Sequence, residues 1–89
     1  MKFTTTALIA AFAATAAAET CFPSWICDSI GAEGFSCDSG DCRSFRASVR
    51  DQLYAGAGIM FSNGDDASRA VAERKLAAAN AVNNYINGN

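Results

Sequence analysis

The chain of 89 residues contains no histidine, only one proline and no cysteine after residue 42. The absence of histidine excludes Ser-His and Cys-His nucleophilic catalysis and removes the usual general base. A chain this small also leaves little room for an enzyme-sized pocket, which typically measures about 300–1,000 Å³. We therefore expect a protein that is not an enzyme and that carries no cofactor.

The N-terminal residues are typical of a secretory signal peptide. Lys2 precedes a short run rich in Ala, Leu, Ile, Phe and Thr, which ends in three alanines at 16–18. The run is shorter than the roughly 20 apolar residues of a membrane span. We expect removal of residues 1–18, so that the mature protein begins at Glu19 and is secreted into the extracellular space. A buried N-terminal helix is the alternative.

The mature chain would be acidic. Removing Lys2 from the seven basic residues leaves six against nine acidic residues, a net charge of −3. Nucleic-acid binding needs a dominant basic field, and membrane-lysing peptides are cationic, so both classes are disfavoured. No second apolar stretch of membrane length follows the first. We expect a monomer with no nucleic-acid partner and no membrane span.

All four cysteines lie close together near the start of the mature chain: Cys21, Cys27, Cys37 and Cys42. An even number of cysteines in a small secreted domain is typical of disulfides, because such a domain has too small a core to be stable alone. The spacing lacks the C-x2-C pair of zinc sites, and no histidine is present, so we expect no metal. Three disulfide pairings are possible, and the sequence does not choose among them.

Residues 19–42, which we call the cap, contain Pro23, the single tryptophan and three glycines, with little apolar periodicity. This composition predicts loops and tight turns, with at most a short strand, held together by the disulfides. The acidic residues of the cap match no catalytic motif and are interpreted as turn and helix-cap formers: Asp28, Glu33, Asp38 and Asp41.

A first helix is predicted directly after the cap. Asp41 can serve as the N-cap of a helix beginning at Cys42. Gly56 and Gly58 are expected to end this helix, and residues 59–61 then form a short strand or a buried connector. Four residues at helical spacing predict its apolar face: Cys42, Phe45, Val49 and Leu53. A disulfide of Cys42 would therefore attach the start of this helix to the cap.

A second helix follows the turn sequence SNGDD at 62–66. Asp65 or Asp66 would cap it, and its Ala-rich composition favours a helix over 67–86. Its predicted inner face carries Val71, Ala78, Val82 and Ile86, with Ala79 and Tyr85 nearby and Asn80 and Asn84 on the opposite face. The predicted fold is mainly α, with a two-helix hairpin at 43–89 attached to the disulfide-knotted loops of the cap in one mature domain.

Two sets of side chains are candidate binding residues. Phe22 and Trp25 lie between the first two cysteines, where large aromatics on a rigid loop make good anchors, unless they form a small core for the cap. Arg43, Arg46 and Arg50 line one edge of the first helix. They form either a cationic strip for an acidic partner or a solvated flank whose stems cover the core. In each case the structural interpretation is favoured. If one of the two sets binds a partner, we expect it to be the aromatic pair, because a loop held rigid by disulfides loses less conformational entropy on binding.

The chain resembles, in type, the small cysteine-rich secreted proteins of filamentous fungi, many of which are effectors that act on a host. Three segments also resemble the virally encoded smut killer toxin family: 37–42 (CDSGDC), 49–52 (VRDQ) and 61–64 (FSNG). That resemblance implies an α/β sandwich, ion-channel-blocking activity and a role for Arg50. The chain departs from the family pattern after the third segment, where the family continues into a strand with another cysteine.

The leading hypothesis for function is a secreted binding protein of the effector or virulence type, which recognises a host or competitor protein or surface component. One alternative is a secreted protein that kills competing microbes, like a killer toxin or an antimicrobial. A second alternative is a small protease inhibitor that presents residues 30–36 between two cysteines.

The secreted product should have the mass of residues 19–89 minus four hydrogens, because we expect two disulfides and the chain has no Asn-x-Ser/Thr glycosylation site. Intact-mass spectrometry of the secreted protein, with and without a thiol-alkylating reagent, measures both features. A retained N-terminus, or thiols that react in the native protein, would contradict the predicted compartment.

Overall fold

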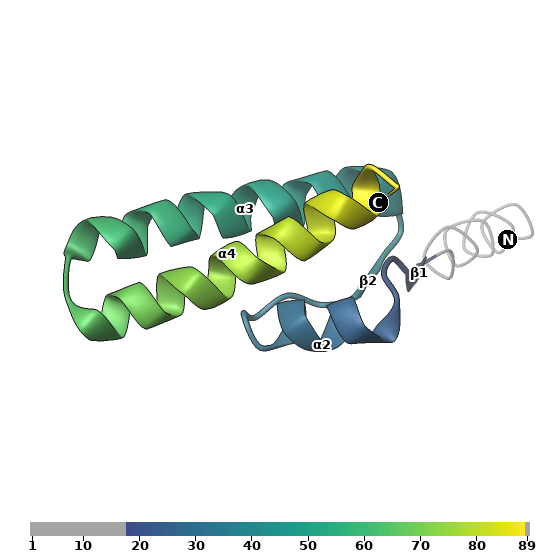
Figure 1. The fold of residues 1–89 in the computed structure, drawn as a ribbon. Helices are drawn as coiled ribbons and strands as arrows, with labels where there is room; N and C mark the ends of the chain where they lie inside the picture. Colours follow the sequence, from purple (N-terminus) through teal and green to yellow (C-terminus); the bar gives the residue numbers. More distant parts are fainter. Residues whose placement is uncertain (1–17, 89) are drawn as a thin grey trace, which may run out of the picture.

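A computed structural model describes residues 18–88 of the protein (Figure 1). Its elements are β1 (Glu19–Thr20), α2 (Ser24–Gly31), β2 (Asp38–Ser39), α3 (Cys42–Asn63) and α4 (Asp66–Ile86). Helices α3 and α4 form an antiparallel hairpin, and α2 packs against α4 (Figure 1). The fold is mainly helical, as predicted, and not the sandwich that the killer-toxin resemblance implies. Apart from Ala18, the predicted signal peptide lies outside the described residues and stays a prediction.

The cap contains a helix that its composition does not predict. Helix α2 begins after Pro23, whose φ of −66° suits the residue that precedes a helix. Ile26 and Ile30, four residues apart, are both fully buried and form the inward face of α2. The prediction of loops alone is therefore wrong for residues 24–31. A helix of two turns shows only one such pair, which is too short a pattern to be recognised as periodic.

Two disulfides tie the cap together: Cys21–Cys42 and Cys27–Cys37. The first joins the residue after β1 to the first residue of α3, so the expected attachment of that helix to the cap is confirmed. The second joins α2 to the loop that follows it. The short strands β1 and β2 pair antiparallel beside these links. Both ends of the α2 segment are thus held by covalent bonds.

Each long helix begins at an aspartate whose carboxylate accepts a hydrogen bond from the backbone amide three residues later. The amide of Ser44 lies 3.3 Å from Asp41 Oδ1, and the amide of Ser68 lies 3.1 Å from Asp65 Oδ2. Hydrogen bonds from these serines lower the pKa of both aspartates below the ordinary value of 3.8. The predicted caps are confirmed, and each satisfies a helix N–H that would otherwise lack a partner.

Helix α3 is longer than predicted. It continues through Gly56 and Gly58 to Asn63, and ends at Gly64, which has a left-handed φ of 80°. Residues 59–61 are therefore helical, and the expectation of a strand or buried connector is wrong. A glycine in a helix interior costs about 1 kcal/mol relative to alanine, which packing of α3 along α4 can offset. Tertiary contact has here overridden a local helix-ending signal.

The buried face of α4 differs from the predicted one. Ala78 and Val82 are buried as expected, but Val71 is half-buried and Ile86 is exposed. The other buried residues of this helix are Ser68, Ala72 and Ala79. Both α3 and α2 pack against α4, so two neighbours decide which side is buried. An alanine-rich helix gives a weak apolar pattern, and the sequence does not reveal the second neighbour.

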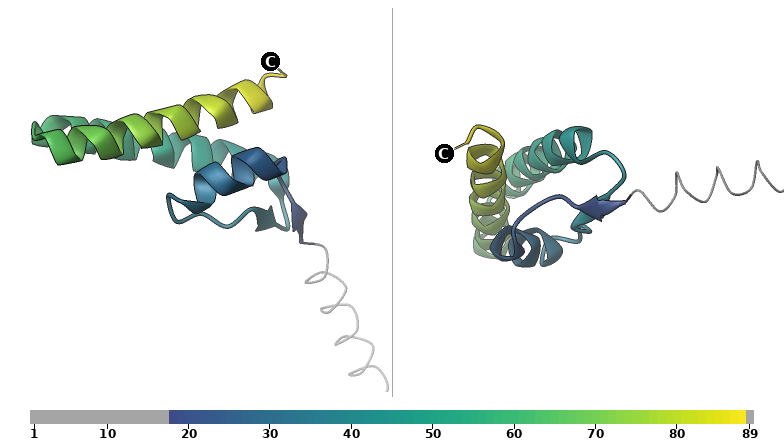
Figure 2. Two further views of the ribbon diagram at one scale, coloured as in Figure 1. Left: turned by 60° about the horizontal axis from the view of Figure 1, so that its bottom comes forward. Right: turned by 90° about the vertical axis from the view of Figure 1, so that its right-hand side faces the viewer.

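The core lies where the three helices meet. It contains Cys21, Phe22, Ile26 and Ile30 from the cap, Val49 and Leu53 from α3, and Ala78, Ala79 and Val82 from α4. The predicted inner face of α3 is thus confirmed, with Phe45 and Cys42 packed at its edge. The hairpin extends beyond α2 toward its turn (Figure 2). Because α2 supplies two of the largest buried side chains, the core depends on its docking.

An ion-pair cluster fastens the loop after α2 to the hairpin. The side chain of Glu33 is only 5% exposed, and its carboxylate lies 3.1 Å from Lys75 Nζ and 3.6 Å from Arg74 Nε, both on α4. The aliphatic stem of Lys75 lies against Gly56 of α3, where a Cβ would be 3.2 Å from Lys75 Cδ. Glu33 lies in the turn after α2, as interpreted, but its side chain also makes tertiary ion pairs with partners far along the chain, which the sequence does not reveal.

Complete reduction of the disulfides should cause a large loss of helical signal in far-UV circular dichroism. Each disulfide closes a loop whose constraint is worth about 3 kcal/mol, and a small domain is stable by only about 5–15 kcal/mol. Freeing the cap also removes Ile26 and Ile30 from the core. A helical signal that stays unchanged after reduction, verified by mass, would show that the disulfides are dispensable for the fold.

Replacing Glu33 by Gln should lower the free energy of unfolding by about 1–3 kcal/mol, because Lys75 would lose a nearly buried charged partner. The matched control is Arg74→Gln, which removes the longer contact of a side chain that is 62% exposed and should cost less than about 1 kcal/mol. Urea unfolding followed by circular dichroism measures both changes. Equal effects of the two substitutions would contradict the assigned role of the Glu33–Lys75 pair.

Candidate functional site

The indole of Trp25 is 62% exposed, although tryptophan is usually well buried. It lies on α2 next to Ile26, and because Ile26 and Ile30 face the core, Trp25 faces outward. The disulfide Cys27–Cys37 holds this helix in place. The exposed aromatic ring is thus carried by a backbone that is fixed by both packing and a covalent bond.

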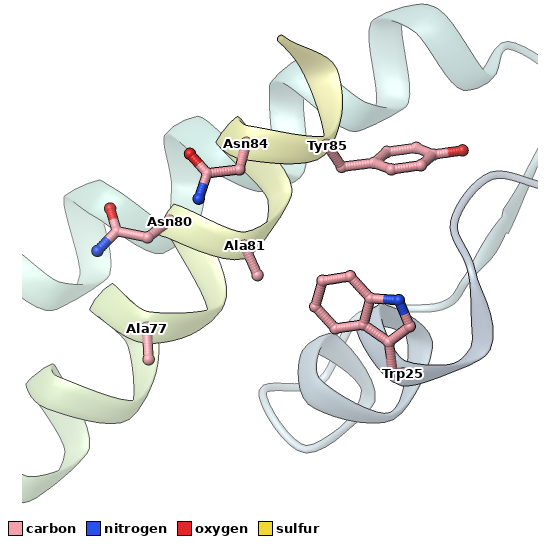
Figure 3. A pocket seen from close by; sticks show the side chains of 6 residues that line it. All are labelled: Trp25, Ala77, Asn80, Ala81, Asn84 and Tyr85. Atoms are coloured by element: carbon pink, nitrogen blue, oxygen red, sulfur yellow. The ribbon is translucent and has the colours of Figure 1, made fainter. Parts of the chain in front are cut away.

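Trp25 forms one side of a groove of about 360 Å³ between α2 and α4 (Figure 3). The groove is lined by Trp25, Ala77, Asn80, Ala81, Asn84 and Tyr85. Figure 3 shows the indole rising from α2 toward Ala81 of α4. Asn80 and Asn84 lie on α4 beyond Ala77 and Ala81, further from the indole. The alanines end at their methyl groups, so the floor between the indole and the asparagines is low. We call this feature the Trp25 groove.

The amides at the edge of the groove differ in what they can still bind. Asn80 Oδ1 accepts a hydrogen bond from the Tyr54 hydroxyl at 2.6 Å, which orients the amide and leaves its NH₂ group as a donor. Asn84 is exposed on the next turn of α4. An asparagine amide has both donors and an acceptor, so this edge of the groove can donate hydrogen bonds to a polar ligand and also accept them from it.

A second pocket, of about 540 Å³, adjoins the Trp25 groove. Its lining residues are Arg43, Arg46, Tyr85 and Ile86, and we call it the arginine pocket. Tyr85 lines both hollows, so the two form one recognition surface built from α2, α3 and α4. Both volumes lie within the range of about 300–1,000 Å³ that is typical of ligand sites, so the expectation that so small a chain leaves little room for such a pocket is wrong.

Arg46 is held in a defined orientation within the arginine pocket. Its Nε donates to the carbonyl oxygen of Cys21 at 2.7 Å, and its Cζ lies 5.3 Å from the centroid of the Tyr85 ring. The Tyr85 ring in turn packs 5.9 Å from that of Phe22. Four of the five guanidinium N–H groups remain for other acceptors. Among residues 18–88, no carboxylate forms a salt bridge with Arg43 or Arg46.

The structure separates the candidate residues that the sequence places together. Phe22 is only 4% exposed and belongs to the core, whereas Trp25 is exposed, so the core interpretation holds for the first and is wrong for the second. Arg43 and Arg46 line one pocket. Arg50 instead contacts Asp51 at 3.0 Å and donates to Asn83 Oδ1 at 3.3 Å, outside the lining of both hollows.

Sequence reasoning missed Tyr85 and the two groove asparagines as candidates. Asn80 and Asn84 are four residues apart, as are Ala77 and Ala81, so a pattern of exposed positions on one helix face was present in the sequence. That pattern does not reveal that Trp25, more than fifty residues earlier, lies beside it. Only the docking of α2 brings the two parts together.

The recognition surface presents aromatic rings, amides and guanidinium groups. Within the described part of the chain, no group of three or more His, Cys, Asp or Glu side chains is placed to hold a metal ion. None of the helices described is both long and apolar enough to cross a membrane. Comparison of the chain with protein-family models, curated proteins and solved structures finds no match.

Proposed function

We propose that the protein is a secreted binding protein of the effector type, which recognises a partner through the Trp25 groove and the adjoining arginine pocket. The observation that carries this proposal is the 62% exposure of Trp25 on a helix anchored by a disulfide. Tryptophan, tyrosine and arginine are the residues that most often dominate binding energy at interfaces. A side chain on a rigid support also loses little conformational entropy when it binds.

Secretion is part of the proposal. The two disulfides support it, because such bonds persist in oxidising environments outside the cytosol. The proposed activity is binding without catalysis, in keeping with a chain that has no histidine. The partner is a component of a host or competitor that meets the protein outside the producing cell.

The protease-inhibitor alternative has little structural support. An inhibitory loop must offer an extended, exposed segment to the enzyme, but residues 30–36 begin at the buried Ile30 and include Glu33, which is engaged by Lys75. The alternative of a killer toxin would use the same recognition surface on a different target. Its prediction is a growth defect in competing microbes and no effect on a host.

Trp25→Ala should weaken binding about 30-fold, which corresponds to about 2 kcal/mol. The measurement uses fluorescently labelled residues 19–89 on intact cells of candidate hosts and of competing microbes, with unlabelled protein as competitor. The matched control is Ile59→Ala, because Ile59 is 64% exposed but lies near the far end of the hairpin. Circular dichroism and the thermal unfolding temperature verify that both variants are folded.

A folded Trp25→Ala variant that binds as the wild type does, or equal losses in the two variants, would overturn the assignment of the Trp25 groove. Growth of the same cells is recorded in parallel. Killing of microbes without an effect on any host would replace the effector assignment by the toxin alternative.

A further inference from the structure

We propose that the recognition surface binds an acidic oligosaccharide, made of pyranose rings that carry carboxylate groups. This inference rests on the proposed function and specifies the chemistry of the partner. It depends on three observations, namely the composition of the Trp25 groove, the unpaired arginines beside it, and the tyrosine that joins the two hollows.

The composition of the Trp25 groove fits a sugar ring. A pyranose presents C–H groups on its faces and hydroxyl groups around its edge. The C–H groups pack well on the negative face of an aromatic ring, which Trp25 supplies from α2 and Tyr85 from α4 (Figure 3). The hydroxyls need donors and acceptors, which the amides of Asn80 and Asn84 supply along α4. The low alanine floor leaves room for a pyranose ring beside these groups.

A peptide partner fits the same groove less well. A large aliphatic peptide anchor gains most of its binding energy in a pocket that large aliphatic side chains enclose. The Trp25 groove has no valine, leucine, isoleucine or methionine in its lining, and its aliphatic surface consists of the methyl groups of Ala77 and Ala81. The aromatic and amide groups therefore favour a saccharide, and a peptide becomes an outcome of the test.

The arginine pocket indicates that the saccharide is acidic. Among the described residues, no carboxylate lies within salt-bridge distance of Arg43 or Arg46, although the chain has more acidic than basic residues. The charge of Asp41 acts on Arg43 only from further away. Arg46 is preoriented by Cys21 and Tyr85, so little entropy is lost when its free N–H groups bind. The planar fork of a guanidinium matches a carboxylate with two parallel hydrogen bonds. A neutral glycan would leave both cations without a partner.

Tyr85 lines both hollows, and this continuity suits a chain of sugar rings. One ring can stack beside Trp25 while a carboxylate of another ring reaches Arg43 and Arg46. The site is therefore expected to prefer oligomers to single sugars, because only an oligomer reaches both hollows.

The test uses folded residues 19–89 and oligomers of galacturonic, glucuronic and mannuronic acid as probes. Trp25 is the only tryptophan, so intrinsic fluorescence reports on the groove directly. At least one oligomer should cause a saturable change in emission. Its fully methyl-esterified form should bind about tenfold more weakly or worse, because the charge-assisted hydrogen bonds are lost. Isothermal titration calorimetry provides a second measurement of affinity.

Arg43→Gln is the decisive variant, because Arg43 is exposed and its loss should not affect folding. It should reduce affinity for the acidic oligomer about tenfold and should leave affinity for the ester unchanged. Arg46→Gln should do the same but needs a stability control, because it removes the hydrogen bond to Cys21. The matched control is Arg69→Gln, an exposed arginine near the hairpin turn, which should bind as the wild type does.

Three results would overturn the inference: no binding to any of the acidic oligomers, equal affinity for an oligomer and its ester, or tighter binding of an acidic peptide that carries the same number of carboxylates. If the labelled protein nevertheless binds cells in a Trp25-dependent manner, the proposed function stands and only the saccharide assignment fails. If the protein binds no cells, or binds them independently of Trp25, the proposed function fails, whatever the oligomers do.

Discussion

The docking of α2 on the helical hairpin is the contact on which the rest of the structure depends. An isolated helix of eight residues is unstable in water, and α2 exists because Ile26 and Ile30 are buried against α3 and α4. The hairpin depends on α2 in turn. Helix α4 contributes only two alanines and one valine to the core, so the large side chains of α2 supply much of the buried apolar volume on this side. The two disulfides stabilise this docked arrangement, because they lower the conformational entropy of the unfolded chain.

The same docking explains two features that look unfavourable when each is considered alone. Glu33 is nearly buried, and it is tolerated because α4 supplies two cations to it. Gly56 lies inside a long helix, where it costs about 1 kcal/mol relative to alanine, but a Cβ at this position would press on the stem of Lys75. The glycine leaves space for the stem of Lys75, whose ammonium group lies 3.1 Å from the Glu33 carboxylate, so a locally unfavourable residue in α3 accommodates a side chain that contacts the cap.

The recognition surface is a consequence of this arrangement. Burial of Ile26 and Ile30 forces Trp25 outward, and the position of α2 decides that the indole stands beside α4 (Figure 3). The antiparallel pairing of α3 and α4 places the start of α3, with Arg43 and Arg46, next to the end of α4, and the disulfide of Cys42 ties this start to the cap. The groups suited to binding thus gather where the chain is most constrained, and a preorganised surface is what recognition by so small a protein requires.

Local chemistry allowed several features to be predicted from the sequence. The caps at Asp41 and Asp65 and the buried face with Val49 and Leu53 depend on residues within one or two helical turns of each other. The hairpin was predicted from the turn sequence at 62–66 between two helical patterns. Helix α2, the full length of α3, the disulfide pairing, the Glu33 cluster and the Trp25 groove did not follow from the sequence. Each depends on residues distant along the chain, such as Trp25 and Tyr85 or Gly56 and Lys75, and only packing in three dimensions brings these together.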